Sequence, residues 1–355
     1  MKKKILISTG GSGGHVIPAK ILIDHLNNNF EVIISTDQRG EKYLKDVSNK
    51  KIKIYTPKLN NLYLLPINLM KILFLSFKSV FILKKNEIDI LISTGGYMSL
   101  PLCLAAKILS IKIFLLEPNM VLGRANNFFL KFSEKIFCYT DSIKNFPSKF
   151  LNKIVLIKPL VRLMFYEKLN NYIKKDKFNF LVIGGSQGAS IFDFEINESF
   201  KEISKSFPIN VTHQTSKSNI EKLKDFYFKH NIDCHVFSYQ ANFFNLINRI
   251  DFCITRGGAS TLAELSLMNI PFLVVPLPTA KDNHQFENAL FYKNNNSCWI
   301  LDQKNFNKKE LSQFFFNLLI NHNEYLKKKE NLKKLNYQNT WNNVNQKIFD
   351  TINAN

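Results

Sequence analysis

The chain has 355 residues, with 45% hydrophobic and 21% charged residues, a balance typical of a globular protein large enough for two core-forming domains. The basic start Lys2–Lys4 leads into an apolar run that glycines interrupt at once, so we expect no signal peptide. The five cysteines are scattered without Cys-x-x-Cys spacing. This pattern predicts neither a disulfide framework nor a zinc site, and it favours a reducing cytoplasm.

Positive charge is concentrated in the first half of the chain. The formal net charge is +20, and residues 1–160 hold 24 Lys and Arg against 10 Asp and Glu. The longest acid-free stretch there, residues 47–86, interleaves eight lysines with aliphatic side chains. Charge alone would allow a nucleic-acid partner, but no nucleic-acid-binding motif accompanies it. The mixture fits an anionic membrane surface better.

Strands and helices alternate through the first half. A short apolar strand over residues 4–8 precedes a helix over Val16–Leu26, and a second strand follows at Glu31–Ser35. Further elements are expected as strands at Lys51–Tyr55, Asp89–Ser93, Ile111–Leu116 and Lys135–Cys138, and as helices at Leu102–Leu109 and Gly123–Phe132. This alternation predicts an α/β fold with a doubly wound parallel sheet.

The stretch Leu62–Lys85 is unusually apolar. Pro66 marks a helix start, and Ile67–Leu83 is apolar nearly all round, with Lys71 and Lys78 as interruptions. The two lysines argue against a membrane-spanning helix. Two interpretations stay open: a buried core helix, or a helix with one face in the core and a Phe- and Leu-rich face in an anionic leaflet.

Residues 10–15 read Gly-Gly-Ser-Gly-Gly-His and join the first strand to the first helix. Glycines let the backbone approach a ligand closely, and a helix N-terminus favours an anion such as phosphate. An ordinary tight turn is the alternative, but His15 adds a titratable group at this point. The loops Thr94–Pro101 and Glu117–Asn119 also follow strands, so we expect the three loops to converge.

The second half repeats this architecture. After a polar linker at Glu167–Lys177, the strand Phe178–Ile183 runs into the glycine loop Gly184–Ser190. Later strands are expected at Ile209–His213, Cys234–Phe237, Phe252–Ile254 and Pro271–Val275, before a helical tail over Lys308–Asn355. We therefore predict two domains, residues 1–165 and 166–355, with the last helix able to pack back on the first domain.

Four ordered motifs carry a resemblance to a known family: Gly10–His15, Gly184–Ala189, Arg256–Ala259 with Thr261 and Glu264, and Asp282–Gln285 with Asn288. In this order and spacing they resemble the MurG family, peripheral membrane N-acetylglucosaminyltransferases of peptidoglycan synthesis. The resemblance implies a GT-B fold, with two Rossmann-like domains facing a central cleft. It also implies inverting transfer of N-acetylglucosamine from UDP-N-acetylglucosamine to the 4-hydroxyl of undecaprenyl-diphosphate-linked muramyl-pentapeptide (lipid I), giving lipid II, at the cytoplasmic face of the inner membrane.

On the acceptor side, the resemblance makes His15 the base for the attacking hydroxyl. Glu117 is the other candidate, as the base itself or as a group that orients His15. The acceptor's diphosphate and sugar would meet a set of residues from three loops: Gly13, Gly14, His15, Tyr97 and Asn126.

On the donor side, Glu264 would accept hydrogen bonds from the ribose hydroxyls, and Gln285 would contact the sugar. The diphosphate would be held by the loop containing Ser186 and by the helix start after Gly258, with His284 assisting. The full set of expected donor-binding residues is Ser12, Gly13, Gly14, Asn119, Arg162, Ser186, Gln240, Ala259, Ser260, Thr261, Leu262, Ala263, Glu264 and Gln285. Arg256 could hold its loop, a salt bridge or the phosphate.

No Asp-x-Asp motif occurs, so we expect no required cofactor and leave a loosely bound magnesium open. Departures from the family pattern include Leu116 and Pro118 around Glu117, Asp193 in place of an Asn, and Tyr239 and Gln240 where an aliphatic backbone contact to uracil is expected. Three alternatives remain: a related GT-B glycolipid glycosyltransferase, a GT-B sugar-nucleotide epimerase and a non-catalytic lipid-diphosphate binder. We expect no nucleic-acid partner.

Overall fold

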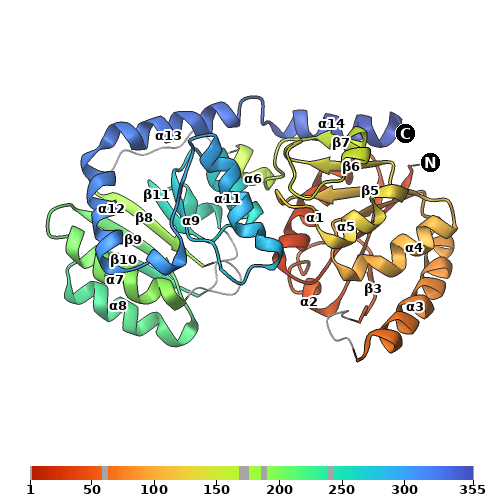
Figure 1. Cartoon of the computed structure of the whole chain (residues 1–355), viewed down its shortest axis with the longest axis horizontal. Helices are drawn as coiled ribbons and strands as arrows, with labels where there is room; N and C mark the ends of the chain where they lie inside the picture. Colours follow the sequence, from red (N-terminus) through yellow and green to blue (C-terminus); the bar gives the residue numbers. More distant parts are fainter. Residues whose placement is uncertain (1, 58–62, 168–175, 185–189, 239–242, 355) are drawn as a thin grey trace. The chain divides into compact units, whose positions relative to one another are not determined.

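The computed structural model describes residues 2–57, 63–167, 176–184, 190–238 and 243–354. The chain divides into two compact units, Met1–Leu163 together with Asn339–Asn355, and Met164–Gln338 (Figure 1). The first crossing thus lies two residues before the boundary that we expected, and the last 17 residues (339–355) belong with the N-terminal unit.

The N-terminal unit is built on a seven-stranded parallel sheet of order β3-β2-β1-β4-β5-β6-β7. Its strands are β1 (Lys4–Ser8), β2 (Glu31–Thr36), β3 (Lys51–Lys53), β4 (Ile90–Ser93), β5 (Lys112–Glu117), β6 (Lys135–Cys138) and β7 (Ile154–Leu156). Its α-helices are α1 (Gly13–Leu26), α2 (Gln38–Glu41), α3 (Leu65–Lys85), α4 (Leu100–Ile108), α5 (Arg124–Phe129) and α14 (Trp341–Ala354).

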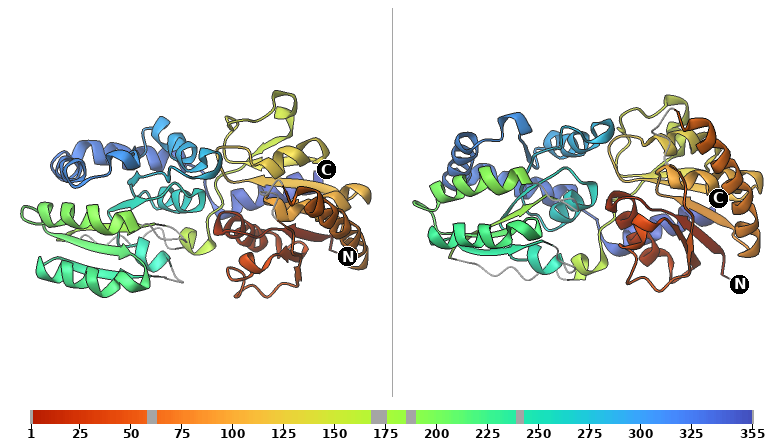
Figure 2. Two further views of the ribbon diagram at one scale, coloured as in Figure 1. Left: turned by 60° about the horizontal axis from the view of Figure 1, so that its bottom comes forward. Right: turned by 90° about the horizontal axis from the view of Figure 1, so that it is seen from below.

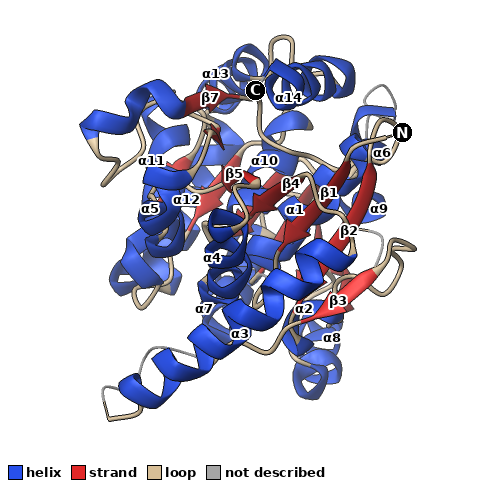
Figure 3. Cartoon of the chain, turned by 90° about the vertical axis from the view of Figure 1, so that its right-hand side faces the viewer, coloured by secondary structure: helices blue, strands red, loops and turns tan. Residues whose placement is uncertain are grey.

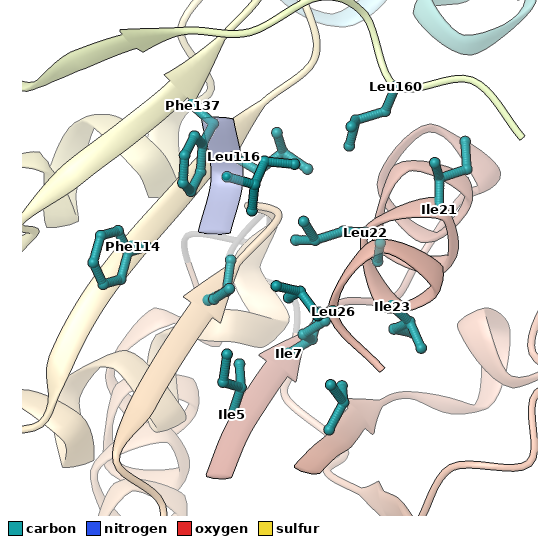
Figure 4. Packing of buried hydrophobic residues seen from close by; sticks show 14 of the residues in the cluster. Ile5, Ile7, Ile21, Leu22, Ile23, Leu26, Phe114, Leu116, Phe137 and Leu160 are labelled. Carbon is teal, nitrogen blue, oxygen red and sulfur yellow. The ribbon is translucent and has the colours of Figure 1, made fainter. Parts of the chain in front are cut away.

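The strands of this sheet are apolar on both faces because helices cover both faces. In β1, Ile5 and Ile7 point into one hydrophobic cluster, and Leu6 points into another on the opposite face. Figure 4 shows the first cluster, in which β1 packs against Leu22 and Leu26 of α1. The sheet is therefore a rigid base for the loops at its strand ends.

The C-terminal helix α14 packs on the N-terminal unit. The ring of Trp341 stacks on His25 of α1 at a centroid distance of 3.6 Å, and Phe349 lies 5.8 Å from Phe30. Figure 2 shows α14, in dark blue, beside the red strands and helices of this unit. The chain's last segment thus braces the helix that begins at the first glycine loop.

The long helix α3 is not the buried core helix that one interpretation of the sequence predicted. Its buried side chains include three small polar ones, Asn68, Ser76 and Ser79, besides Ile72 and Leu83. The helix itself packs along α4 (Figure 3). Most of its large apolar side chains are exposed: Ile67, Leu69, Met70, Leu73, Phe74, Phe77 and Phe81. By length and hydropathy α3 is the one described helix that could cross a membrane.

The C-terminal unit has a six-stranded parallel sheet of order β10-β9-β8-β11-β12-β13. Its strands are β8 (Phe178–Ile183), β9 (Ile209–Gln214), β10 (Asp233–Phe237), β11 (Phe252–Thr255), β12 (Phe272–Val274) and β13 (Trp299–Ile300). Its α-helices are α6 (Leu163–Glu167), which begins at the boundary, α7 (Ser190–Ile203), α8 (Ile220–Lys229), α9 (Phe244–Ile247), α10 (Ala259–Leu267), α11 (His284–Asn294), α12 (Lys308–Ile320) and α13 (His322–Leu335).

Each sheet reverses its strand order at one point, between β1 and β4 in the first unit and between β8 and β11 in the second. Loops after these strands lie side by side at the carboxyl edge, where open α/β sheets bind ligands. In the N-terminal unit they are the loops that carry His15 and Tyr97. In the C-terminal unit the loop after β11 carries Arg256–Gly258.

Candidate active site

His15 lies in the first turn of α1, and its imidazole reaches the loop after β4. Its Nδ1 atom is 2.8 Å from the carbonyl oxygen of Thr94. Because a carbonyl can only accept, Nδ1 carries the proton and Nε2 of the neutral ring is left as an acceptor. The hydroxyl of Thr94 also donates to Thr9 Oγ1 at 2.9 Å, and Thr9 Oγ1 donates to the His15 carbonyl at 3.0 Å. These bonds join the first two glycine loops.

The part of the second glycine loop that lies nearest His15 consists of two glycines, Gly95 and Gly96, and therefore brings no side chain to the imidazole. Gly95 and Gly96 have φ values of +83° and +82°, a left-handed conformation that favours glycine. A methyl group on Gly96 would lie 3.6 Å from Nε2 of His15. The loop therefore leaves the unprotonated side of the imidazole open, as a base that meets a substrate hydroxyl requires.

Glu117 lies at the end of β5, and its buried carboxylate is fully occupied by its own loop. Oε1 accepts from the backbone and side-chain nitrogens of Asn119 at 3.2 and 3.1 Å. Oε2 accepts from the Gly123 amide at 2.8 Å and from Nδ2 of Asn126 at 2.9 Å. Four donors satisfy the Glu117 carboxylate. The geometry therefore favours a structural role, in which Glu117 holds residues 117–126 in place, over a role as a base.

Asn126, expected on the acceptor, is also buried. Its Nδ2 donates to the carbonyl of Leu116 at 3.1 Å as well as to Glu117. A methyl group on Gly95 would lie 3.2 Å from the Asn126 amide, so the side chain packs directly beneath the second glycine loop. Its Oδ1 has no hydrogen-bond partner in the described part of the chain.

Asp37, the N-cap of α2, and Arg39, within α2, join the same site and were not singled out from the sequence. Oδ1 of Asp37 accepts from the Gly11 and Gly40 amides, each at 2.8 Å. Arg39 lies with Nε 3.5 Å from Oδ2 of Asp37, and its Nη2 donates to the Tyr97 hydroxyl. Burial raises the pKa of Tyr97, an effect that the Arg39 charge opposes. The sequence did contain a hint of this role. Arg39 is a positively charged residue that follows β2, the neighbour of β1, at the edge of the sheet where ligands bind.

In the C-terminal unit, α10 begins directly after Gly258. This N-cap has no side chain to satisfy the first-turn N–H groups, which belong to Ala259, Ser260 and Thr261. Glu264 is buried one turn further on, and Leu262 and Ala263 are also buried. The helix start can therefore offer backbone donors to an anion, with Leu262 and Ala263 contributing through the helix rather than through their side chains.

The helix α11 docks its N-terminus on the Gly257 loop. A methyl group on Gly257 would lie 2.1 Å from the carbonyl oxygen of Gln285, so only glycine permits this contact. Asn288 Nδ2 donates to the Gly257 carbonyl at 2.9 Å, and Oε1 of Gln285 accepts from the Leu277 amide at 2.9 Å. The last two sequence motifs are thus brought together. His284 Nδ1 binds the Lys281 carbonyl at 2.8 Å.

Two family models match these two units in order. The model of the glycosyltransferase family 28 N-terminal domain matches residues 5–138, and that of the C-terminal domain matches residues 179–343. The chain belongs to glycosyltransferase family 28.

Relatives of this family 28 chain cover its whole length. A Pelagibacter ubique protein, named UDP-N-acetylglucosamine--N-acetylmuramyl-(pentapeptide) pyrophosphoryl-undecaprenol N-acetylglucosamine transferase, is 52% identical over 356 aligned residues, covering 100% of both chains. The crystal structure of Acinetobacter baumannii MurG matches with a TM-score of 0.79 and 24% identity, again over 100% of both chains. The predicted GT-B fold is confirmed by these matches.

The GT-B fold is shared with enzymes of another activity. UDP-GlcNAc 2-epimerase from Neisseria meningitidis, bound to UDP-GlcNAc, matches with a TM-score of 0.69 and 16% identity, over 99% of this chain and 100% of that one. The likeness shows the fold alone. Sequence identity, not the fold, therefore separates the family 28 transferase from the epimerase.

Arg256 in this family 28 chain is a structural residue. It is buried, and its Nη1 donates to the Val275 carbonyl and to Oε1 of Gln303, both at 2.8 Å. Its guanidinium also lies over the ring of Phe192, 4.9 Å from the centroid, and burial lowers its pKa. These contacts hold the loop after β11 against β12. Of the roles that the sequence left open for Arg256, they favour holding its loop and not binding a phosphate.

Asp193, in the first turn of α7, belongs to a buried polar network. Its Oδ2 accepts from Thr215 Oγ1 at 2.7 Å and from Asn219 Nδ2 at 2.9 Å, and His213 lies 3.5 Å away. Burial acts to raise the pKa of Asp193, but the nearby His213 and the hydrogen bonds from Asn219 and Thr215 outweigh it and lower the pKa. The network ties α7 to the loop after β9.

Some expected residues fall elsewhere. Ser186, Tyr239 and Gln240 lie outside the described residues. Asn119 and Arg162 belong to the N-terminal unit, Asn119 beside Glu117 and Arg162 directly before α6. Ser12 and Gly14 are exposed and Gly13 is buried in the first loop. In the described ranges no three His, Cys, Asp or Glu side chains form a group that could hold a metal ion.

Proposed function

We propose that this chain transfers N-acetylglucosamine from UDP-N-acetylglucosamine to the muramyl sugar of undecaprenyl-diphosphate-linked muramyl-pentapeptide, in peptidoglycan synthesis. The observation that carries the proposal is the 52% identity, over the full length of both chains, with the Pelagibacter transferase named for that donor and acceptor. The likeness to the UDP-GlcNAc 2-epimerase, at 16% identity, is a likeness of fold and does not favour epimerase activity for this chain.

His15 is the general base in this proposal. Its Nδ1–H is fixed by the Thr94 carbonyl at 2.8 Å, so Nε2 takes the proton of the acceptor's 4-hydroxyl as the oxygen attacks the anomeric carbon. The bond from that carbon to the diphosphate breaks, UDP leaves with the electron pair, and the configuration inverts. Glu117 supports the reaction by holding residues 117–126, and does not exchange a proton.

The glycine loops of the N-terminal unit hold the acceptor. Backbone N–H groups of the first loop and the N-terminus of α1 face the lipid-linked diphosphate, which places the muramyl hydroxyl near Nε2 of His15. Tyr97 is available to the sugar, whereas Asn126 is buried and supports the second glycine loop from beneath. This assignment leaves the C-terminal unit for the nucleotide.

The start of α10 and the docked end of α11 hold the donor. First-turn N–H groups at Ala259, Ser260 and Thr261 bind the diphosphate of UDP. Glu264 accepts from the ribose hydroxyls, and Gln285 contacts the sugar through the amide nitrogen that the Leu277 contact leaves available. We expect donor binding through these contacts without a required metal ion.

The outer face of α3 docks on an anionic membrane. Phe74, Phe77 and Phe81 are 71%, 66% and 73% exposed, and four lysines of the same helix flank them without any acidic residue. Burying these rings in the interface is favourable, and the lysines attract anionic headgroups. One face of α3 is buried and the helix packs along α4, so we propose that it lies on the membrane surface and does not cross it. We propose on this basis that the enzyme acts at the cytoplasmic face of the cell membrane, where its acceptor is anchored.

Product analysis tests the transfer directly. The purified chain is incubated with radiolabelled UDP-N-acetylglucosamine and a water-soluble lipid I analogue, and label should move to the analogue with release of UDP. UDP-galactose in place of the donor tests the glycolipid alternative. Donor converted without acceptor would support an epimerase, and binding without turnover would support a non-catalytic carrier protein. Either result would overturn the proposed transfer.

A further inference from the structure

A cation lies against the first glycine loop and has no part in the reaction described so far. Arg39 is the second residue of α2, and its side chain is half exposed. A methyl group on Gly11 would lie 3.4 Å from Nη2 of Arg39. The guanidinium is therefore within contact distance of any group that occupies the space above Gly11.

Two side chains hold Arg39 in this place. Its Nε lies 3.5 Å from Oδ2 of Asp37, and the Asp37 carboxylate is itself anchored by the Gly11 and Gly40 amides. Its Nη2 donates to the hydroxyl of Tyr97, whose ring centroid is 5.7 Å from the guanidinium carbon. Arg39 thus bridges the two glycine loops that flank His15.

One end of the guanidinium remains available. Within the described residues, Nη1 of Arg39 makes no hydrogen bond, because its contacts are confined to Nε, Nη2 and the Tyr97 ring. A planar fork that is held on one side and open on the other is suited to oxygen atoms of a phosphate. The adjacent backbone N–H groups of the glycine loop favour the same ligand.

We propose that Arg39 is a substrate-binding residue that contacts the diphosphate of the lipid-linked acceptor. The proposal rests on the assignment of the glycine loops to the acceptor. Arg39 adds a full positive charge and bidentate geometry to a site otherwise made of backbone dipoles. A monophosphate offers less charge and fewer oxygens, so the contribution of Arg39 should be larger for a diphosphate.

A purely structural role is the alternative, because Arg39 also touches Asp37 and Tyr97. Three variants separate the two roles. Arg39→Gln removes the charge, Arg39→Lys keeps the charge without the fork, and Lys45→Gln removes one charge from an exposed side chain six residues further along the chain. Asp37 keeps its two backbone donors in all three, so each variant should fold.

Competitive inhibition against the lipid I analogue gives the decisive readout, with geranyl diphosphate and geranyl monophosphate as probes. Arg39→Gln should weaken inhibition by geranyl diphosphate about tenfold or more, and inhibition by the monophosphate by a clearly smaller factor. Arg39→Lys should fall between, and Lys45→Gln should match the unsubstituted protein. The KM for UDP-N-acetylglucosamine should stay within about twofold in every variant.

Two results would overturn the inference, and they differ. If Arg39→Gln weakens inhibition by both compounds by the same factor, or weakens inhibition by neither, Arg39 has only a structural role. The assignment of the glycine loops to the acceptor would then stand. If geranyl diphosphate does not compete with the acceptor in the unsubstituted protein, the glycine loops do not hold the acceptor diphosphate, and the inference fails with that assignment.

Discussion

Nδ1 of His15 lies 2.8 Å from the carbonyl oxygen of Thr94, a residue 79 positions later in the chain. This one contact fixes the tautomer of the imidazole and joins the loops after β1 and β4, which are adjacent strands. A base needs a lone pair at a defined place, and here the backbone of one loop sets the protonation of a side chain on the other.

Replacing Glu117 should damage the loop and leave the base in place. In Glu117→Gln the amide NH2 faces N–H donors wherever it points, because both carboxylate oxygens accept from two donors. We expect a loss of about 2 kcal/mol or more in the free energy of unfolding, and a lower kcat. The pH dependence of the remaining activity should be unchanged. A lost acid limb in the pH–rate profile would instead make Glu117 the base.

Gly257→Ala should disrupt donor binding alone. The added methyl group would lie 2.1 Å from the Gln285 carbonyl, so the start of α11 must move. We expect the KM for UDP-N-acetylglucosamine to rise about tenfold or more, with the KM for the acceptor nearly unchanged.

Gly258→Ala is the matched control for that variant. Its methyl group would meet no atom closer than Thr261 Oγ1 at 3.9 Å, and its backbone has an ordinary φ of −74°. Donor KM should change little. Equal effects from the two alanines would show that the Gly257–Gln285 contact is not what matters for the donor.

Removing three rings from α3 should weaken membrane binding without unfolding the chain. Phe74, Phe77 and Phe81 are exposed, so changing all three to serine should preserve the circular dichroism spectrum. Sedimentation with vesicles containing anionic lipid should show affinity reduced by about tenfold or more. Phe194→Ser with Phe228→Ser removes two exposed rings from the C-terminal unit and should not change binding. Unchanged binding of the α3 variant would exclude this face as the docking surface.

The stacked pair of His25 and Trp341 should make the N-terminal unit sensitive to acid. Burial lowers the pKa of His25 to about 4 from its ordinary 6.5, an effect that Asn345 only partly opposes. Protonation therefore favours the unfolded chain, and stability falls as the pH drops below about 6.5. Between pH 7 and pH 5 the loss should be about 2 kcal/mol.

His25→Phe should remove that loss, because phenylalanine can stack on Trp341 and does not titrate. Urea unfolding followed by fluorescence gives the measurement, in a Trp299→Phe background that leaves Trp341 as the reporter in the N-terminal unit. His322→Phe, a change at an exposed position, serves as the control. A pH dependence that survives in His25→Phe would assign it to another group.

Sequence patterns predicted the strands well because parallel strands buried on both faces are continuous apolar runs. They also placed His15 and Glu117 in segments that follow strands, and the carboxyl ends of parallel strands share one edge of the sheet. The orientation of α3 could not be predicted: its apolar residues occur all round, and only the burial of Asn68, Ser76 and Ser79 in the folded unit shows which face is outside.

Contacts distant in sequence account for the rest. Arg39 carries no local motif, and its partner Tyr97 is 58 residues away. Arg256 lies in a glycine motif that suggests a phosphate ligand, yet its partners Val275 and Gln303 bury it. The partners of Arg39 and Arg256 depend on which side chain fills a given space in the folded unit. Hydrophobic periodicity along the sequence does not encode this.

The most direct test of the account is transfer by His15→Ala compared with its binding of UDP. Removal of the base should lower kcat by about 100-fold or more, while calorimetry should give a Kd for UDP within about twofold of the unsubstituted protein, since the nucleotide is assigned to the other unit. His15→Ala that transfers N-acetylglucosamine to the lipid I analogue at an undiminished rate would contradict the account.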